Sequence, residues 1–375
     1  MVNCRNHGLS PDVPQITARR DFLRWCVLVP AYVALEQRTG AAQTETRTRT
    51  PLLCGQIGIA HAHASGKMQA MRNLPLEWKV VGVSEPDPKR RNIGKGSPYE
   101  GLSWMTEQEL LAVPGLRAVA VETEVKDLVP TALRVVRAGK HIHLDKPAGE
   151  SLGQFRELLD EAERRGLTVQ MGYMFRYNPG FQLLYRFLAE GWLGRVMFVE
   201  GVMTKWMSSE GRPQLLPYRG GAMFELGCHL LDAVVKILGK PKTVHVHGCR
   251  HGNDELLDDQ LAVLEYEQAT ATVRASVVEH GGETRRSFKV VGKNGTFEIR
   301  PLEAPAPMVR LTMGCDVPGY KKGMHEIPMP KLPRFDGEFL DLSRVIRGEK
   351  TFEYSHTHDL DVQETVLRAS GMPVD

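Results

Sequence analysis

The sequence of 375 residues lacks a strong charge of either sign, because 48 lysines and arginines stand against 45 aspartates and glutamates. This balance argues against a basic surface for nucleic acid or for an anionic membrane. The six cysteines show no Cys-x-x-Cys pair or other ligand-like spacing, so neither a disulfide framework nor a zinc site is indicated. Internal repeats and low-complexity tracts are also missing. The length is enough for two domains of ordinary size.

A long apolar run is missing too. The longest candidate, "WCVLVPAYVAL" at 25–35, is shorter than the stretch of about 20 residues that spans a bilayer. It follows the pair Arg19 and Arg20 and precedes the small residues of "RTGAAQ" at 38–43, which is the layout of a secretory signal. The arginine pair with Phe22 and Leu23 resembles a twin-arginine export signal. We therefore expect residues 1–50 to be a signal peptide and linker, cleaved near Ala42, and the protein to be periplasmic or otherwise exported. The alternative is a docking arm on a cytoplasmic protein.

Extended and helical segments alternate from residue 51 to residue 172, which predicts a doubly wound parallel sheet of the Rossmann type. Expected strands begin near residues 51 and 78 and lie at 116–123, 141–146 and 168–174. Helices are expected after Gly58 and at 106–115, 126–139 and 151–166, the last with a Ser151/Gln154 capping box.

Two glycines, Gly55 and Gly58, mark the end of the first expected strand, where a dinucleotide-binding loop would read Gly-x-Gly-x-x-Gly. Ala60 and His63 take the places of its second and third glycines. Glu85 ends the second strand, 27 residues after Gly58, where an acid accepts hydrogen bonds from a ribose 2′-hydroxyl and repels a 2′-phosphate. The loop therefore predicts NAD in preference to NADP; a solvated turn at Glu85 is the alternative.

Two His-x-His pairs, His61/His63 and His141/His143, have a spacing that could hold a metal ion. The sequence shows no third ligand at a convincing distance along the chain from either pair. We therefore expect no metal site, and solvated or packed histidines instead.

The segment "GKHIHLDKPAG" at 139–149 ends a short strand with Asp145, Lys146 and Pro147. Pro147 disfavours helical backbone at Lys146, so Lys146 should stand at the carboxyl end of the strand. That edge of an open α/β sheet is where ligands bind. A solvated lysine in a turn is the alternative.

Residues 173–375 predict a second domain of the α+β class, with an open, mainly antiparallel sheet and helices. Asn178-Pro179 begins a helix, strand-like segments dominate from 242 to 300, and helices are expected at 336–347 and 358–369.

One expected helix, from Met223 to Leu238, is nearly all apolar. Its polar residues fall at i, i+4, i+7 and i+11 and form a single narrow stripe of Glu225, His229, Asp232 and Lys236. The stripe could line a pocket. The alternative is a mostly buried helix whose exposed edge carries a Glu–His pair.

Three motifs resemble the Gfo/Idh/MocA oxidoreductases: Gly58-x-Ala60 after the first strand, "DKPAG" at 145–149 and "GCHLLD" at 227–232. Asp145-Lys146-Pro147 stands where the family usually has Glu-Lys-Pro. The resemblance covers residues 51–375. It implies an N-terminal Rossmann domain, a C-terminal α+β domain and reversible hydride transfer between a nicotinamide and a carbinol group of a sugar or polyol.

The resemblance also implies roles for single residues. His229 would be the base, Lys146 the cationic partner, and Glu225 would stand where the family often has an aspartate. Cofactor contacts would come from Gly55, Gly58, Ala60, His61, His63, Glu85, Thr123, Asp145, Lys146, Pro147 and Arg176. Substrate contacts would come from Lys146, Tyr177, Glu225, His229 and Asp232.

The sequence departs from the family in the glycine loop and at "VETEVKD" (121–127), where Glu124 and Asp127 add negative charge beside Thr123. Two other functions therefore stay open: a glycoside hydrolase or lyase that retains its NAD and oxidises the sugar transiently, and a non-catalytic nucleotide- or sugar-binding protein. The expected partner is a small sugar or polyol, and the resemblance implies a homo-oligomer through the second sheet.

Overall fold

The computed structural model describes residues 49–91 and 93–375. Residues Pro51–Asp375 form one compact unit. The arginine pair and the apolar run of the expected signal lie outside the described residues. Within the described ranges, no helix has both the length and the apolar character needed to cross a membrane.

The first sheet has six parallel strands in the order β3-β2-β1-β4-β5-β6. The strands are β1 (Leu52–Ile57), β2 (Trp78–Ser84), β3 (Trp104–Met105), β4 (Leu116–Val121), β5 (His141–Leu144) and β6 (Val169–Met171). The helices that connect them are α3 (Ala64–Asn73), α4 (Glu107–Leu111), α5 (Val125–Arg137) and α6 (Leu152–Arg164). The predicted doubly wound sheet is confirmed, and the strand order reverses between β1 and β4, where open α/β sheets bind ligands.

Local sequence explains where these helices begin. Thr106 caps α4 through a reciprocal capping box with Glu109. The Ser151 hydroxyl accepts a hydrogen bond from the Gln154 backbone N–H at 3.2 Å and so begins α6. The apolar stripe of α6 is buried in the core, as its period requires; it comprises Leu152, Phe155, Leu158, Leu159 and Ala162.

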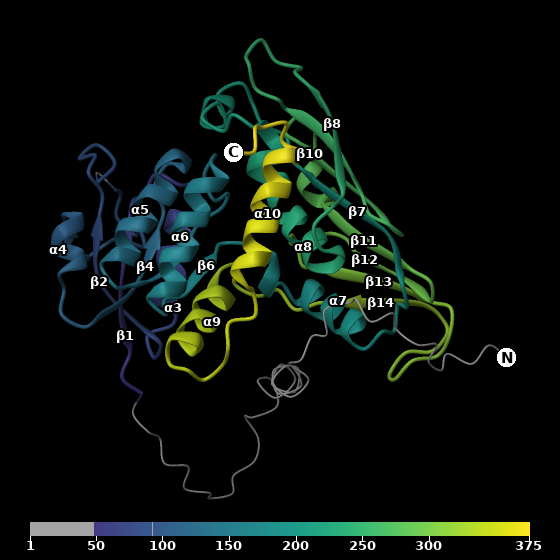
Figure 1. The fold of residues 1–375 in the computed structure, drawn as a ribbon, viewed down its shortest axis with the longest axis horizontal. Helices are drawn as coiled ribbons and strands as arrows, with labels where there is room; N and C mark the ends of the chain where they lie inside the picture. The colour runs from purple at the N-terminus through teal and green to yellow at the C-terminus, as the bar shows by residue number, and fades with distance from the viewer. Residues whose placement is uncertain (1–48, 92) are drawn as a thin grey trace, which may run out of the picture. The chain divides into compact units, whose positions relative to one another are not determined.

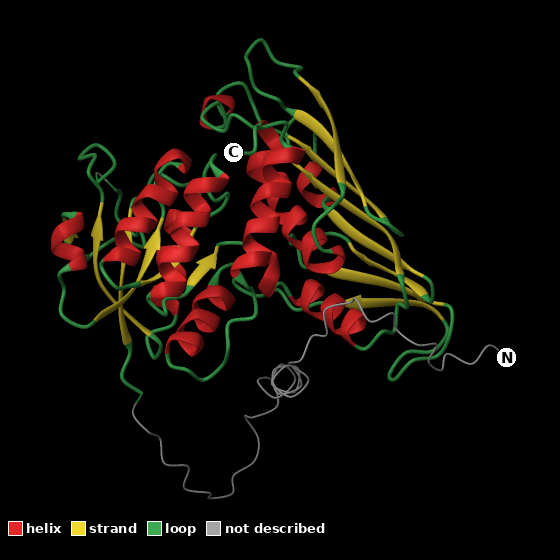
Figure 2. Cartoon of the chain, viewed as in Figure 1, coloured by secondary structure: helices red, strands yellow, loops and turns green. Residues whose placement is uncertain are grey.

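The second sheet has eight strands in the order β14-β13-β12-β11-β7-β10-β9-β8. Its strands, yellow in Figure 2, are β7 (Val196–Thr204), β8 (Thr243–Cys249), β9 (Asp259–Glu265), β10 (Thr270–Ser276), β11 (Ser287–Gly292), β12 (Gly295–Ile299), β13 (Met308–Met313) and β14 (Gly323–Pro328). Only the β10–β7 pair is parallel among its described pairings. The predicted α+β domain is confirmed.

The helices of this half are α7 (Pro179–Ala189), α8 (Cys228–Leu238), α9 (Asp336–Ile346) and α10 (His356–Ala369), with short 3₁₀ turns η1 (Met174–Tyr177), η2 (Arg212–Gln214) and η4 (Gly282–Arg285). The helix expected over 223–238 begins as a π-helical turn, η3 (Met223–Gly227), and continues as α8. α10 packs on both α8 and α6 (Figure 1).

The predicted domain boundary at residue 172 follows the end of β6, yet α9 packs against α3 of the first half. Buried Lys67 on α3 forms an ion pair with buried Glu338 on α9. The indole N–H of Trp78 donates to the carbonyl oxygen of Phe339 at 3.0 Å. The C-terminal part of the chain thus completes the core of the N-terminal sheet.

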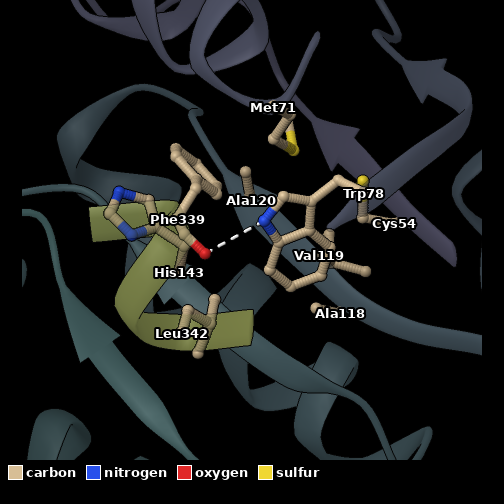
Figure 3. A pocket seen from close by; sticks show the side chains of 9 residues that line it. All are labelled: Cys54, Met71, Trp78, Ala118, Val119, Ala120, His143, Phe339 and Leu342. Carbon is tan, nitrogen blue, oxygen red and sulfur yellow. Dashed lines mark hydrogen bonds between the residues drawn. The ribbon is translucent and has the colours of Figure 1, made fainter. Parts of the chain in front are cut away.

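Figure 3 shows a small gap beneath α9, between Trp78, Phe339 and His143. It leaves no space for a water molecule, and the indole N–H of Trp78 in its lining is bonded to Phe339. Nδ1 of His143 is engaged on Gln170 Oε1 at 3.0 Å. We therefore regard the gap as part of the core.

Candidate active site

The strands of the first sheet end in register. Ile57 pairs with Ser84 on one side and with Val121 on the other, and Val121 pairs with Leu144. The residues that follow these strand ends are Glu85, Gly58, Glu122 and Asp145. Three buried carboxyl groups therefore stand in one row along the carboxyl edge of the sheet.

Gly58 is required at its position for two reasons. Its φ of +84° lies in the left-handed region that favours glycine. A Cβ built on Gly58 would also stand 2.7 Å from the backbone nitrogen of Thr123. Gly58 thus lets the β1–α3 loop approach the β4–α5 loop. Gly55, which was expected at the cofactor, lies inside β1, and a Cβ there would meet Leu110 at 2.7 Å, so Gly55 serves packing instead.

The Glu85 carboxylate binds the loop that follows β1. Its Oε2 accepts the Ile59 N–H at 2.9 Å, and its Oε1 accepts the Asp87 N–H at 2.9 Å. Arg90 lies 3.9 Å from Glu85 and forms a 2.5 Å hydrogen bond with Glu124. The charge of Glu124 is therefore neutralised by Arg90, which lowers the pKa of Glu124 through a direct hydrogen bond.

His61 and His63, in the loop between β1 and α3, turn toward Asp145. His61 Nδ1 lies 3.2 Å from Asp145 Oδ2, and His63 Nδ1 lies 3.2 Å from Asp145 Oδ1. The sequence expectation of no metal site rested on the lack of a third ligand, and the structure supplies one from a distant strand. Ala60 lies in the same loop, one residue before His61.

Lys146 is fully buried at the carboxyl end of β5 and is held by the π-helical turn. Its Nζ donates to the Glu225 carbonyl oxygen at 2.6 Å and to Glu225 Oε1 at 3.3 Å. Burial acts to lower the pKa of Lys146, but the Glu225 carboxylate outweighs it and raises that pKa above its usual value. Burial acts to raise the pKa of Glu225, but Lys146 lowers it to about 2. The two side chains are therefore a buried cation and anion at neutral pH.

His229 lies one turn after Glu225, and its ring is surrounded by Tyr173, Phe175 and His63 at centroid distances of 6.1, 5.7 and 6.0 Å. Burial, and then the charge of Lys146, hold the pKa of His229 well below its usual range. Among the described residues its buried Nδ1 has no hydrogen-bond partner. His229 is thus a neutral imidazole beside a buried ammonium group.

Three residues at this site were not anticipated from the sequence: Lys205, Tyr218 and Glu122. Lys205 follows β7, and its Nζ lies 3.8 Å from Glu225 Oε2, so two lysines flank one carboxylate. Tyr218 is close enough to Lys146 and Glu225 for their charges to act on its pKa, which burial raises. The signal that could have found Lys205 and Glu122 is their position directly after a strand end.

Other predicted site residues are engaged elsewhere. Arg176 is fully buried and pairs with Asp232 and Asp359, each at 2.6 Å. Asp232 Oδ1 also lies 3.2 Å from His358 Nε2. Arg176 and Asp232 are therefore bonded to other residues and not to Lys146. The Tyr177 hydroxyl donates to Asp341 on α9 at 2.9 Å. A buried ion pair and the packing of α9 therefore occupy three side chains that were expected at cofactor or substrate.

The polar stripe expected over Glu225, His229, Asp232 and Lys236 faces the interior along most of its length, since residues 228–235 are all buried. Lys236 alone reaches the periphery, where it pairs with Glu353 at 2.7 Å. The alternative of an exposed polar edge is wrong for Glu225, His229 and Asp232.

A nicotinamide dinucleotide fits this edge at its two ends. Glu85 offers carboxylate oxygens at the end of β2, where this fold places a ribose hydroxyl. Thr123 and Lys146 each follow by two residues the paired strand ends Val121 and Leu144. The loop that follows β1 is poorer in free donors, because the His61 N–H binds the Glu122 carbonyl at 3.0 Å and the His63 N–H points at His61 Nδ1 at 3.3 Å. The donor set thus fits the ribose and nicotinamide better than the pyrophosphate.

The fold and site define a two-domain oxidoreductase with a Rossmann half. The family profile described as "Oxidoreductase family, NAD-binding Rossmann fold" matches residues 52–173, and that described as "GFO/IDH/MocA C-terminal domain" matches residues 181–298. Together these matches cover well over half of the chain. The chain belongs to the Gfo/Idh/MocA family of NAD(P)-dependent oxidoreductases.

Relatives in this family include dehydrogenases. The chain is 28% identical over 275 residues to trans-1,2-dihydrobenzene-1,2-diol dehydrogenase of Macaca fuscata fuscata, with 71% of this chain and 78% of the relative covered. It is 24% identical over 339 residues to scyllo-inositol 2-dehydrogenase (NAD(+)) of Bacillus subtilis, with 85% and 93% covered. A 3-ketoreductase from Actinomadura kijaniata, solved with TDP-benzene and NADP, shares the fold at a TM-score of 0.68 and 19% identity, with 85% and 97% covered.

Proposed function

We propose that this protein is an NAD-dependent dehydrogenase that oxidises a secondary alcohol of a sugar or polyol, or reduces the matching ketone. The observation that carries the proposal is the pairing of buried Lys146 with Glu225 beside neutral His229, at the carboxyl edge of a Rossmann sheet. When bound, the nicotinamide supplies the hydride acceptor.

Proton transfer falls to His229 in this proposal. A neutral imidazole with a free Nδ1 accepts the proton of the substrate hydroxyl as the carbinol hydride leaves. Because burial lowers the pKa of His229, the imidazole remains neutral at physiological pH and also somewhat below it. In the reverse direction the same atom returns the proton to the alcohol oxygen.

Charge stabilisation falls to Lys146. Its ammonium group, fixed by the Glu225 carbonyl at 2.6 Å, can stabilise the negative charge that develops on the substrate oxygen. The raised pKa of Lys146, caused by Glu225 acting against burial, keeps it from serving as the base. Glu225 is a positioning residue, and Lys205 on its far side shares that role.

The preference for NAD rests on Glu85. Its carboxylate can accept bonds from ribose hydroxyls and repels a 2′-phosphate. The nearby Arg90 is already bonded to Glu124 at 2.5 Å, which makes Arg90 a weaker partner for the 2′-phosphate of NADP. The substrate class is supported by the diol and inositol named for the two dehydrogenase relatives.

Export stays a prediction, since its signal lies outside the described residues. A hydrolase or lyase that retains its NAD and oxidises the sugar transiently also stays a prediction. That function would be favoured if NAD co-purified with the protein and did not exchange with NAD added to the solution.

A substrate screen followed by two variants tests the proposal. Purified protein is offered a panel of sugars and polyols with NAD, and NADH absorbance is followed. Lys146→Ala and His229→Ala should each lower turnover by about 10²–10⁴-fold, the usual range for acid–base groups. The double variant should lose little more, because members of one catalytic unit are non-additive. The affinity for NAD should change far less.

Lys236→Ala is the matched control. Lys236 lies on α8, the helix of His229, but at the periphery of the molecule, so its removal should leave turnover unchanged. An active His229→Ala protein, or additive losses in the double variant, would contradict the assignment.

A further inference from the structure

Four polar side chains converge between β1, β4 and β5 in an arrangement typical of a metal site. Nδ1 of His61, Nδ1 of His63 and a carboxylate oxygen of Asp145 lie within 4.8 Å of one another. Glu122 Oε2 lies 3.9 Å from His61 Nδ1. Ligands around zinc, with bonds of about 2.0 Å, stand about 3.3 Å apart in a tetrahedral site. Each histidine lies 3.2 Å from an oxygen of Asp145, His61 Nδ1 from Oδ2 and His63 Nδ1 from Oδ1, so the carboxylate presents one oxygen to each ring.

The tautomer of His61 leaves a lone pair facing this cluster. Nε2 of His61 lies 3.0 Å from the carbonyl oxygen of Lys146, so Nε2 carries the proton. The His63 backbone N–H points at Nδ1 at 3.3 Å, which also marks Nδ1 as an acceptor. An N–H donated to a backbone carbonyl is how proteins orient a metal-binding histidine.

Within the part of the chain that the structure describes, both oxygens of Glu122 and Oδ2 of Asp145 have no hydrogen-bond donor. Both residues are fully buried. A buried carboxylate without a donor is strongly unfavourable unless a cation or a proton joins it. Asp145 Oδ2 lies 3.2 Å from His61 Nδ1, which accepts the His63 N–H at 3.3 Å, so a bound cation would take the place of that hydrogen bond.

The charges around the cluster leave room for a divalent ion. Glu122, Asp145 and Glu338 are the buried acids of the cluster. Two buried cations lie nearby, Lys67 bonded to Glu338 and Lys146 paired with Glu225. Because Lys67 is paired with Glu338, Glu122 and Asp145 are the two acids whose charges a divalent ion would balance.

We propose that His61, His63, Asp145 and Glu122 bind one divalent transition-metal ion, with Zn²⁺ the best fit. Two imidazole nitrogens with carboxylate oxygens suit Zn²⁺ better than Mg²⁺ or Ca²⁺, which prefer oxygen ligands alone. The site lies one residue from Lys146, and the His63 side chain is 11% exposed, which gives the ion a path from solvent. The site stands on its own residues and does not depend on the dehydrogenase activity.

A second group of potential ligands comprises Asp232, His358 and Asp359. Asp359 Oδ2 there also has no donor among the described residues, but this group already contains a cation. The Arg176 guanidinium already lies between the two acids, 2.6 Å from each. That group therefore serves as the comparison for the experiment.

The full chain, stripped with a chelator and desalted, is titrated with Zn²⁺ alone in a calorimeter, and bound metal is counted by mass spectrometry. We expect about one Zn²⁺ per chain. His63→Gln and Asp145→Asn should each weaken binding by about 100-fold or more, and His358→Gln should leave it unchanged. Co²⁺ in place of Zn²⁺ should give the visible absorption of a four-coordinate site, lost in His63→Gln.

Circular dichroism of each variant shows whether it folds; if Asp145→Asn does not, His63→Gln decides the outcome. No stoichiometric uptake by the unmodified protein would overturn the proposal, as would uptake that is lost in His358→Gln and kept in His63→Gln. NAD binding is measured separately on the chelator-treated protein. If that protein binds NAD without metal, the dehydrogenase proposal does not depend on the result of the Zn²⁺ titration.

Discussion

At the scale of single residues, Glu85 shows how one side chain can serve both the fold and a ligand. Its two oxygens accept one backbone N–H each, from Ile59 and Asp87. A carboxylate has about four acceptor positions, so capacity remains for ribose hydroxyls. The same negative charge that holds the loop would then select the cofactor.

Glu85→Gln should narrow the preference for NAD. The amide keeps an acceptor oxygen and the side-chain volume but removes the charge that opposes a 2′-phosphate. We expect the affinity for NADP relative to NAD to rise on the order of tenfold, or about 1.4 kcal/mol. Calorimetry with both nucleotides measures this ratio, and Glu163→Gln, at an exposed position on α6, is the control. The unmodified protein binding NADP as tightly as NAD would refute the role of Glu85.

At the scale of elements, the π-helical turn Met223–Gly227 explains how Lys146 is held. The Glu225 carbonyl in this turn accepts bonds from Lys146 Nζ at 2.6 Å and from Cys228 Sγ at 3.4 Å. π-Helical turns occur often at functional sites, where they redirect backbone groups and side chains. Here the turn delivers both a carbonyl and a carboxylate to one lysine.

The contact between α3 and α9 includes the buried ion pair of Lys67 and Glu338. Lys67→Met should therefore lower the free energy of unfolding. Removing one partner of a buried ion pair destabilises a protein by about 3–5 kcal/mol. Burial raises the pKa of Glu338 to about 7 even beside Lys67, so the unpaired acid can protonate. Without Lys67 that pKa should rise further, so the loss of stability relative to the unmodified protein should grow as pH rises above about 7.

Urea unfolding at several pH values measures this loss. Lys67→Met with Glu338→Leu should recover most of the stability, because two apolar groups can replace a buried pair. Lys321→Met removes the partner of an exposed pair with Asp316 and should cost less than about 1 kcal/mol. A Lys67→Met protein as stable as Lys321→Met would show that the pair is unimportant.

At the scale of the whole molecule, three buried histidines and the half-buried His141 should make stability depend on pH. Burial is the first cause that lowers the pKa of His141 to about 4, that of His63 and His143 to about 3, and that of His229 well below its usual range. Below about pH 6.5 the unfolded chain therefore binds more protons at these four sites than the folded protein does. The free energy of unfolding should fall as the pH is lowered through this range. Glu122 and Glu338, whose pKa values are raised by burial, oppose this trend in part.

His141→Asn should reduce that dependence. The Asn oxygen can replace His141 Nδ1 as acceptor of the Thr168 N–H, a bond of 3.0 Å, without titrating. Between about pH 6.5 and 5, the slope of unfolding free energy against pH should fall by about one proton, or about 1.4 kcal/mol per pH unit. Urea unfolding across this range gives the slope, with His280→Asn at an exposed position as control. An unchanged slope in His141→Asn would contradict the buried neutral state.

The sequence by itself determined the local features of this protein. Alternating apolar segments specify the strands and helices, because periods of 2.0 and 3.6 residues decide which side chains share a face. Lys146 was placed at a strand end because Pro147 excludes helix there. His229 and Glu225 were placed together because four residues make one helical turn. The signal, the oligomer and the domain boundary stay predictions.

Only the tertiary structure decided which side chains meet across the fold. Arg176 and Asp232 were expected at the ligand, and the fold instead joins them to Asp359, because a buried guanidinium must be compensated by charge. Asp145 joins His61 and His63, and Glu338 reaches Lys67, from segments far apart in the chain. Such pairs follow from strand order and register, which depend on the packing of whole elements and leave no short-range pattern in the sequence.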